Sequence, residues 1–200
     1  MFLNSVTFLE DFRCYKKDEK IEFNDKLTVI TGDNGSGKST LISSIRSMFK
    51  IKWSFSDDPQ CYNKVVLDCK NLEGKLTYLD LTQDLYKTSP EIQTHDIDTY
   101  LSALHSSSGE GSFLQILKLI EKEAAGSDLL ILDEPERGLS IKKQNIILKI
   151  IDHINKLHPN LQIILITHSD LLMCLNENVF STSHKKYISI QEYMKWMFEV

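Results

Sequence analysis

Residues 26–45 read KLTVITGDNGSGKSTLISSI, and this stretch decides the fold. Alternating apolar residues up to Thr31 predict a strand, and Leu41 and Ile45 begin an apolar series with helical spacing. Between the two, residues 32–39 fit the pattern G-x-x-x-x-G-K-[ST] in full, in the strand-to-helix context that this pattern requires. The stretch therefore predicts a phosphate-binding loop (P-loop).

The residue types of this loop suit the phosphates of a nucleotide. Glycines allow successive backbone N–H groups to curl around a phosphate, and the helix N-terminus adds positive potential. Lys38 is predicted to reach the β- and γ-phosphates of ATP, and the Ser39 hydroxyl to ligate Mg²⁺. The predicted nucleotide contacts, which follow Gly32, are Asp33, Asn34, Gly35, Ser36, Gly37, Lys38, Ser39 and Thr40.

Two later apolar runs end in polar residues that suit the same chemistry. LLILDE (129–134) ends in two carboxylates, and LQIILIT (161–167) leads into His168. Ligands collect at the carboxyl ends of parallel strands, so these residues should meet the P-loop. We expect Asp133 to hold Mg²⁺, Glu134 to accept a proton from the attacking water, and His168 to contact the γ-phosphate or that water.

The strand and helix signals together predict an α/β fold. FLNSVTFL and KIEF precede the P-loop strand, residues 64–82 predict a hairpin around Gly74, and isoleucines from Ile147 to Ile154 predict an amphipathic helix. Ser89 looks like a helix start, and helical spacing recurs from about Ile97 to His105. Strands that alternate with helices favour a mainly parallel sheet with right-handed crossovers.

Composition places limits on the class of protein. The 200 residues, 42% of them hydrophobic, are enough for one domain, and the formal net charge of -5 gives no footprint for nucleic acid, although a local basic stripe or dimer groove stays open. No apolar run approaches a membrane span and no signal core is present, so a soluble, cytoplasmic protein is expected. The four cysteines, Cys14, Cys61, Cys69 and Cys174, are expected to be reduced thiols.

Several residues are expected to have structural roles. Glu136 is predicted to be a surface carboxylate, and Trp53 and Phe55 are predicted to pack in the core. Structural roles are also expected for the remaining histidines, which are His95, His105, His153, His158 and His184. The tail from Asp170 to Val200 is expected to pack on the sheet, with docking of a partner as the alternative.

Taken together, the motifs from about residue 2 to 170 resemble an ABC-type ATPase head, and within that superfamily the SMC and RecF type and the related small OLD-like ATPases. The resemblance rests on NSVTFLEDFRCY and the P-loop, SSGE (107–110) at the place of the ABC signature, LDEPERGLS as Walker B and D-loop, and ITHS as the switch histidine. Ser108 and Ser140 depart from it, standing where many signatures have Gly and many D-loops have Asp.

The resemblance implies a P-loop NTPase fold with a mainly parallel core sheet, an N-terminal antiparallel strand lobe and a small helical signature lobe. It implies that the signature residues Ser107, Ser108, Gly109 and Glu110 grip the nucleotide of a second subunit, so that ATP and Mg²⁺ hold a homodimer or pseudo-dimer together. Gln83 is the expected Q-loop ligand of the metal, with Gln60 as the rival, and Arg13 is expected at the phosphates or in solvent.

As a single ABC-type domain, residues 1–200 divide into four expected parts: a strand lobe with the P-loop (1–88), a helical signature lobe (about 89–125), the Walker B, D-loop and switch core (126–170) and the tail (171–200). About 70 residues separate Gly37 from Ser107, which leaves no room for the SMC coiled coil. About 30 residues follow His168, too few for an OLD nuclease domain.

Three functions fit these features. The first is an ATPase that dimerises on ATP and switches a separate effector, such as a nuclease, in DNA repair or phage defence. The second is the nucleotide-binding subunit of a membrane transporter, and the third is a nucleotide-sensing scaffold with little turnover. Glu110 in place of the transporters' Gln, and Ser169 after the switch histidine, favour the first function.

Overall fold

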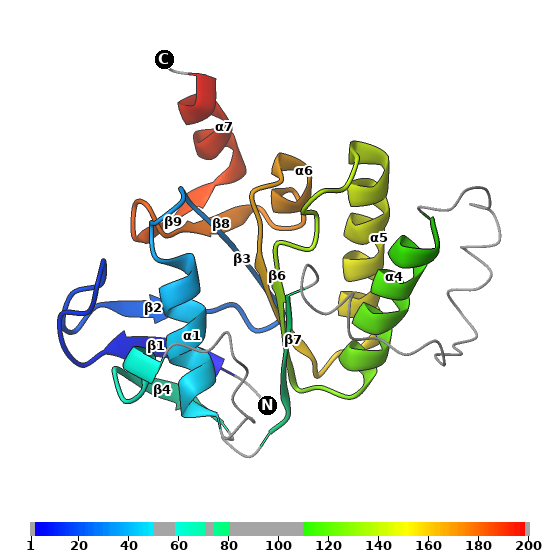
Figure 1. The fold of residues 1–200 in the computed structure, drawn as a ribbon. Coiled ribbons are helices and arrows are strands. Elements are labelled where there is room, and N and C mark those ends of the chain that lie inside the picture. Colours follow the sequence, from blue (N-terminus) through cyan, green and yellow to red (C-terminus); the bar gives the residue numbers. More distant parts are fainter. Residues whose placement is uncertain (1–2, 50–58, 71–73, 81–109, 199–200) are drawn as a thin grey trace.

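Within the residues that the computed structural model describes (3–49, 59–70, 74–80 and 110–198), the core is a six-stranded sheet in the order β5-β6-β7-β3-β8-β9 (Figure 1). Neighbouring strands are parallel from β5 to β8, and β9 runs antiparallel to β8. The mainly parallel α/β fold is thus confirmed. In sheet order the strands are β5 Leu76–Asp80, β6 Leu129–Asp133, β7 Gln162–Ile166, β3 Leu27–Thr31, β8 Asn178–Ser181 and β9 Lys186–Ser189.

A smaller antiparallel sheet has the order β2-β1-β4, with β1 Leu3–Phe8, β2 Lys20–Glu22 and β4 Val65–Cys69. The hairpin predicted over residues 64–82 is therefore wrong. Val65–Cys69 pairs with β1, whereas Leu76–Asp80 crosses to the large sheet and runs parallel to β6. Alternation of apolar residues indicates which face of a strand is buried, but it does not indicate the strand's partner.

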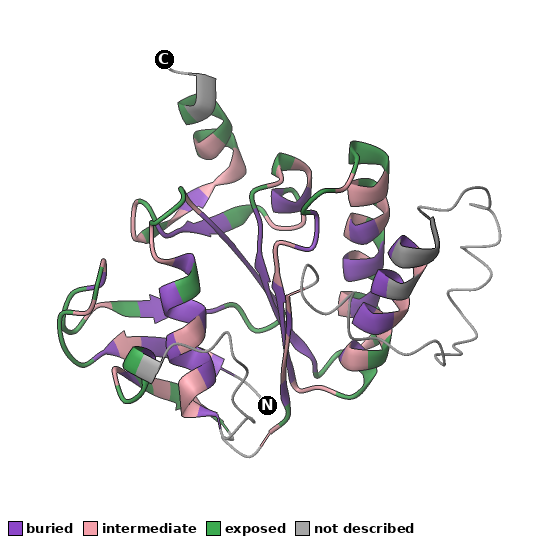
Figure 2. Cartoon of the chain, viewed as in Figure 1, coloured by how far each residue is buried: buried purple, intermediate pink, exposed green. Residues whose placement is uncertain are grey.

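Four of the described helices cover the two faces of the large sheet. Helix α1 (Lys38–Met48) and the small sheet share one apolar cluster with β3, β6 and β7. Helices α4 (Glu110–Ala125), α5 (Ile141–Leu157) and α6 (Asp170–Met173) share a second cluster with the opposite face. The short η1 turn (Pro59–Cys61) lies beside α1. Figure 2 shows the central strands buried between these two layers.

The buried strands show why the sheet has a core on each side. Along β6, Leu129 and Ile131 join the cluster with α1, while Leu130 and Leu132 join the cluster with α4 and α5. This alternation follows from the pleat, which points successive side chains to opposite faces. A strand buried on both faces therefore reads as a continuous apolar run, as the sequence predicted for this strand.

The two sheets are joined by a buried glutamine. Gln162, at the start of β7, accepts a hydrogen bond from the backbone N–H of Leu3 at 2.7 Å and donates to the Leu3 and Asn24 carbonyls, each at 2.8 Å. Buried backbone groups need such partners because water cannot reach them. One side chain thus sets the position of β1 against the large sheet.

The tail packs on the sheet, as expected, because β8 and β9 complete one edge of it. Helix α7 (Ile190–Phe198) then extends beyond β9 (Figure 1). Trp196 of this helix contacts His184, with ring centroids 3.7 Å apart, and stays 48% exposed. The proposed boundaries of the four parts of the chain stay predictions.

Candidate nucleotide-binding and catalytic site

The P-loop connects β3 to α1 at the carboxyl end of the parallel strands. Gly37 has φ +108° just before Lys38 opens the helix. The Lys38 ammonium donates hydrogen bonds to the carbonyls of Gly32 at 2.7 Å and Asp33 at 3.0 Å. Burial lowers the pKa of Lys38, and the nearby carboxylates of Glu134, Asp133 and Asp33 oppose that shift. The lysine is thus folded back onto a loop whose donors can receive phosphate.

The turn between β8 and β9 packs directly on this loop, a contact that the sequence analysis missed. Ser183 Oγ accepts from the Asp33 N–H and donates to the Asp33 carboxylate, both at 2.9 Å. Thr182 Oγ1 is hydrogen-bonded to Ser36 Oγ, and Lys185 donates to the Ser36 carbonyl at 3.1 Å. The sequence holds a run of three hydroxyl residues here, Ser181-Thr182-Ser183. This run can be assigned to the P-loop only when the pairing of β8 with β3 is known.

A second segment, the turn after β1, also contacts the P-loop. Arg13 Nη1 donates to Thr40 Oγ1 at 3.3 Å, near the N-terminus of α1. Tyr15 donates its hydroxyl hydrogen to the Gly37 carbonyl at 3.0 Å, and the Cys14 thiol donates to the Ser36 carbonyl at 3.3 Å. The structure therefore brings Arg13 next to one of the predicted nucleotide contacts, and its role toward phosphate stays a prediction.

Asp133 stands at the end of β6, where burial raises the pKa of its carboxyl group. The Tyr78 hydroxyl of β5 opposes that shift by donating to Asp133 Oδ2 at 2.7 Å. The Arg46 guanidinium of α1 lies over the Tyr78 ring, 3.8 Å from its centroid. Tyr78 could not be assigned to the site from the sequence, because only the pairing of β5 with β6 brings it to Asp133.

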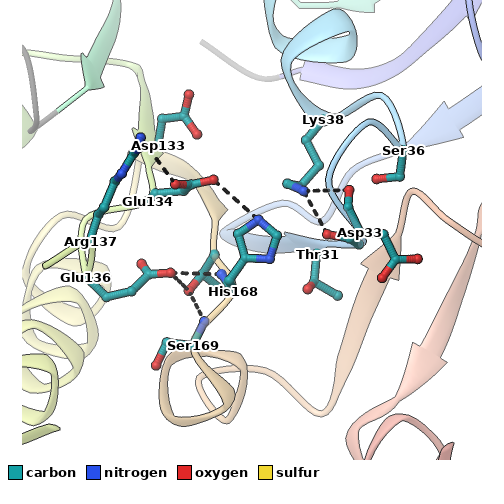
Figure 3. Close-up of polar contacts among 12 residues, drawn as sticks. Thr31, Asp33, Ser36, Lys38, Asp133, Glu134, Glu136, Arg137, His168 and Ser169 are labelled. Carbon is teal, nitrogen blue, oxygen red and sulfur yellow. Dashed lines mark hydrogen bonds and ion pairs between the residues drawn. The ribbon is translucent and has the colours of Figure 1, made fainter. Parts of the chain in front are cut away.

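Glu134 and His168 face each other across the site (Figure 3). His168 Nε2 lies 3.3 Å from Glu134 Oε1, and Arg137 Nη1 lies 3.9 Å from Glu134 Oε2. Glu134 has φ +45°, a conformation that is costly for a residue with a Cβ and is held here by its surroundings. The residue predicted as general base and the residue predicted as switch histidine are thus in direct contact.

Glu136 is not the surface carboxylate that the sequence suggested. Its side chain is buried, at 7% exposure, and Oε1 accepts hydrogen bonds from Thr167 Oγ1 at 2.7 Å and from the His168 N–H at 2.8 Å. The expectation failed because a charge after a buried strand ordinarily reaches water. Here the turn that follows β6 directs the side chain back toward the end of β7 (Figure 3).

The loop at the end of β7 has a second attachment. Ser169 Oγ donates to Gln144 Oε1 of α5 at 2.7 Å, and Gln144 donates in turn to the Leu139 carbonyl at 2.9 Å. Ser169 also accepts from the Leu172 N–H at 3.3 Å, which caps α6. The loop after β7 (167–169) is therefore attached both to the turn after β6 and to α5.

Several predicted site residues lie outside the part of the chain that the structure describes. These are Gln83, Ser107, Ser108 and Gly109, together with Trp53, Phe55, His95 and His105. Glu110 is the first residue of α4, and Gln60, the alternative to Gln83, is exposed in η1. The described cysteines are all free thiols, and the described histidines outside the site are His153, His158 and His184.

The oxygen groups at this edge fit magnesium. Asp133 supplies a partly buried carboxylate whose Oδ2 accepts the hydrogen bond from Tyr78, and Ser39 is exposed on the first turn of α1. Carboxylate and hydroxyl oxygens, completed by phosphate and water, are the ligands that Mg²⁺ takes beside nucleotides. Over the described residues, no cluster of three or more His, Cys, Asp or Glu forms an all-protein metal site. The donors suit a metal that arrives with a nucleotide.

The chain belongs to the AAA domain family, because the model of that family matches residues 8–198. Its fold is that of P-loop ATPase heads. The SMC head domain from Thermotoga maritima superposes with a TM-score of 0.61 at 16% identity, covering 90% of this chain and 94% of that one. No curated protein sequence matches the chain.

Two transporter structures show the same fold. A putative metal-chelate type ABC transporter in an inward-facing conformation gives a TM-score of 0.57 at 16% identity, covering 95% of this chain and 84% of that one. The dimeric structure of a bacterial ABC transporter cassette gives 0.54 at 12% identity, covering 94% and 96%. In the described part of this chain, no helix has the length and apolar character needed to cross a bilayer.

Proposed function

We propose that this protein is a Mg²⁺-dependent ATPase that dimerises on ATP and switches a separate effector. The observation that carries the proposal is the convergence of Lys38, Asp133, Glu134 and His168 at one edge of the sheet. Lys38 opens the helix that follows β3, and the other three residues stand at or just after the ends of β6 and β7. These three strands are distant in sequence and adjacent in the sheet. Ligands of open α/β sheets bind at this edge.

Each residue has one role in the proposed hydrolysis. Lys38 and the P-loop amides hold the β- and γ-phosphates, while Ser39 and Asp133 hold Mg²⁺, which draws charge from the phosphate oxygens. Glu134 accepts a proton from the water that attacks the γ-phosphorus, as the bond to the β–γ bridging oxygen breaks and ADP leaves. His168 lies against Glu134, 3.3 Å away, where it orients the base or the water.

The signature segment completes the site in trans in this proposal. Ser107, Ser108 and Gly109 precede α4, and a helix N-terminus that opens with Ser and Gly is an anion site. Each subunit then supplies one P-loop and one signature, so two ATP molecules lie between two chains. The resemblance to SMC heads and to a dimeric cassette supports this arrangement at the level of the fold.

The biological role that we propose is in DNA repair or phage defence, with a nuclease as the effector. Glu110 and Ser169 favour this role over that of a transporter subunit. Copurification with a nuclease would support it, whereas copurification with a membrane-spanning partner would support the transporter. A wild-type protein that binds Mg-ATP and releases no phosphate would instead support the nucleotide-sensing scaffold.

Light scattering of two variants tests the dimer. Glu134→Gln removes the base and keeps its shape, so bound ATP should persist and the dimer should accumulate. With Mg-ATP this variant should move from the 23.0 kDa of one chain to about twice that mass. Adding Ser107→Arg places a bulky cation in the contact between subunits and should return the protein to a monomer that still binds ATP.

Ser102→Arg in the Glu134→Gln background is the matched control, because it adds the same charge outside the four predicted signature residues. This control should still form the dimer. Two results would contradict the proposal: a mass that does not depend on ATP, or a double mutant whose monomer no longer binds ATP. The second result would mean that Ser107 serves the nucleotide of its own chain.

A further inference from the structure

Glu136 is a buried carboxylate whose two oxygens have different environments. Oε1 accepts the two hydrogen bonds from Thr167 and His168, whereas Oε2 is buried without a hydrogen-bond partner among the described residues. An unpaired buried polar atom costs free energy, and more when the group is charged. Such an atom in a native structure calls for an explanation. Here we look for it in the two hydrogen bonds that Oε1 accepts.

Oε1 joins the turn after β6 to the end of β7. The turn itself is closed by the hydrogen bonds from Arg137 N–H to the Glu134 carbonyl at 3.0 Å and from Leu139 N–H to the Glu136 carbonyl at 2.9 Å. Thr167, the other donor, also accepts from the Ser169 N–H at 2.9 Å. The backbone of this strand end is also held by hydrogen bonds from the Glu134 N–H to the Ile166 carbonyl at 2.9 Å and from the Thr167 N–H to the Ile30 carbonyl at 3.0 Å. Glu136 Oε1 adds the contact to the His168 N–H itself, on the side where that histidine meets Glu134.

We propose that Glu136 is a positioning residue, which holds His168 in register with Glu134. A charged acceptor makes shorter and stronger hydrogen bonds than a neutral one, and two donors that converge on one oxygen define the loop closely. Glu136 follows Glu134 by two residues, so any movement of this turn moves the base and the anchor of the histidine together. The effect on turnover rests on the proposed ATPase function, whereas the effect on the position of His168 does not.

NMR spectroscopy of the histidine rings tests the position directly. The ring C–H signal of His168 is assigned by its loss in His168→Gln, and the other histidines serve as internal references. Glu136→Ala removes both hydrogen bonds and should displace the His168 signal. Glu136→Gln keeps an acceptor oxygen in the same place, so the signal should stay close to that of the wild type.

The control is Ile154→Val or Ile154→Ala, whichever lowers the melting temperature as much as Glu136→Ala does. Ile154 is buried near the far end of α5 and belongs to the cluster on the other face of the sheet. Its loss should leave the His168 signal in place. Should Glu136→Ala fail to fold, Thr167→Val, which removes one of the two donors at nearly constant shape, should displace the signal in the same direction.

Turnover gives an independent measure. Glu136→Ala should lower kcat by about 10- to 100-fold, the cost of a catalytic group displaced by about 1 Å, while KM for ATP changes little. Glu136→Gln should retain most of the wild-type kcat. A His168 signal that does not move in Glu136→Ala, or that moves equally in the Ile154 control, would overturn the proposal. A wild type without turnover would overturn the ATPase function and leave the NMR comparison decisive.

Discussion

Gly37→Ala is expected to destabilise the protein more than Gly35→Ala, although both substitutions add one methyl group to the same loop. Gly37 and Gly35 have φ angles of +108° and +81°, so alanine is strained at either position. At Gly37 a Cβ atom would also lie 2.2 Å from the Cys14 sulfur and 2.9 Å from a ring carbon of Tyr15. At Gly35 it would meet no described atom within 4 Å.

These contacts set the size of the difference. Positive φ costs an alanine about 1–2 kcal/mol at either position. Overpacking in a filled site costs about 1–3 kcal/mol more, and Gly37→Ala alone carries it. Tyr15 cannot yield easily because its ring is fully buried and stacked on Phe8, with centroids 4.2 Å apart. For a chain of this length, the melting temperatures should therefore differ by about 2–12 °C.

Urea and thermal unfolding without nucleotide measure the effect, because ligand binding would add its own stabilisation. Cys14→Ala supplies a further test, since it removes the sulfur that the new methyl group would strike. In the Cys14→Ala background, Gly37→Ala should cost at least about 0.5 kcal/mol less than in the wild type. Equal costs for the two glycine variants, or no coupling with Cys14, would refute the close contact between this turn and the P-loop.

Four further outcomes are expected. Lys38→Ala should abolish ATP binding measured by calorimetry, since it deletes the cation that faces the β- and γ-phosphates; near-normal affinity in a folded variant would count against the site. Asp133→Ala should remove Mg²⁺-dependent phosphate release, and unchanged release would sink the assignment of the metal. Tyr78→Phe keeps the ring against Arg46 but loses the bond to Asp133, so the Mg²⁺ concentration for half-maximal turnover should rise about 10-fold in a magnesium titration. With a net charge of -5, the isolated chain should bind duplex DNA weakly and with a steep salt dependence in fluorescence anisotropy; tight binding that ignores salt would contradict this.

Local chemistry explains why much of the site could be predicted from the sequence. The P-loop is one continuous segment in which each residue type has a chemical reason, so Lys38 and Ser39 could be proposed as phosphate and metal contacts without a structure. Asp133 and His168 end continuous apolar runs, and strands of this kind are buried in parallel sheets with their carboxyl ends together. The structure then confirms that β6 and β7 are neighbours.

Other features depend on pairings that no local pattern contains. The segments on either side of Gly74 alternate like a hairpin, yet each finds its partner elsewhere, β4 with β1 and β5 with β6. Only the second pairing brings Tyr78 to Asp133. Likewise, Ser183 reaches Asp33 across 150 positions of sequence because β8 lies beside β3.

The sequence by itself determined the class of fold and the P-loop, and it allowed the acidic and histidine residues at the ends of β6 and β7 to be proposed as its partners. Tertiary structure alone decided that Glu136 is buried and attached to the backbone of His168. The reason is physical: periodicity and motifs record the conformation and burial of short segments, whereas a buried charge is tolerated only where a distant part of the chain supplies its hydrogen bonds. Those donors, on Thr167 and His168, lie about 30 residues away and meet Glu136 only after the sheet has formed.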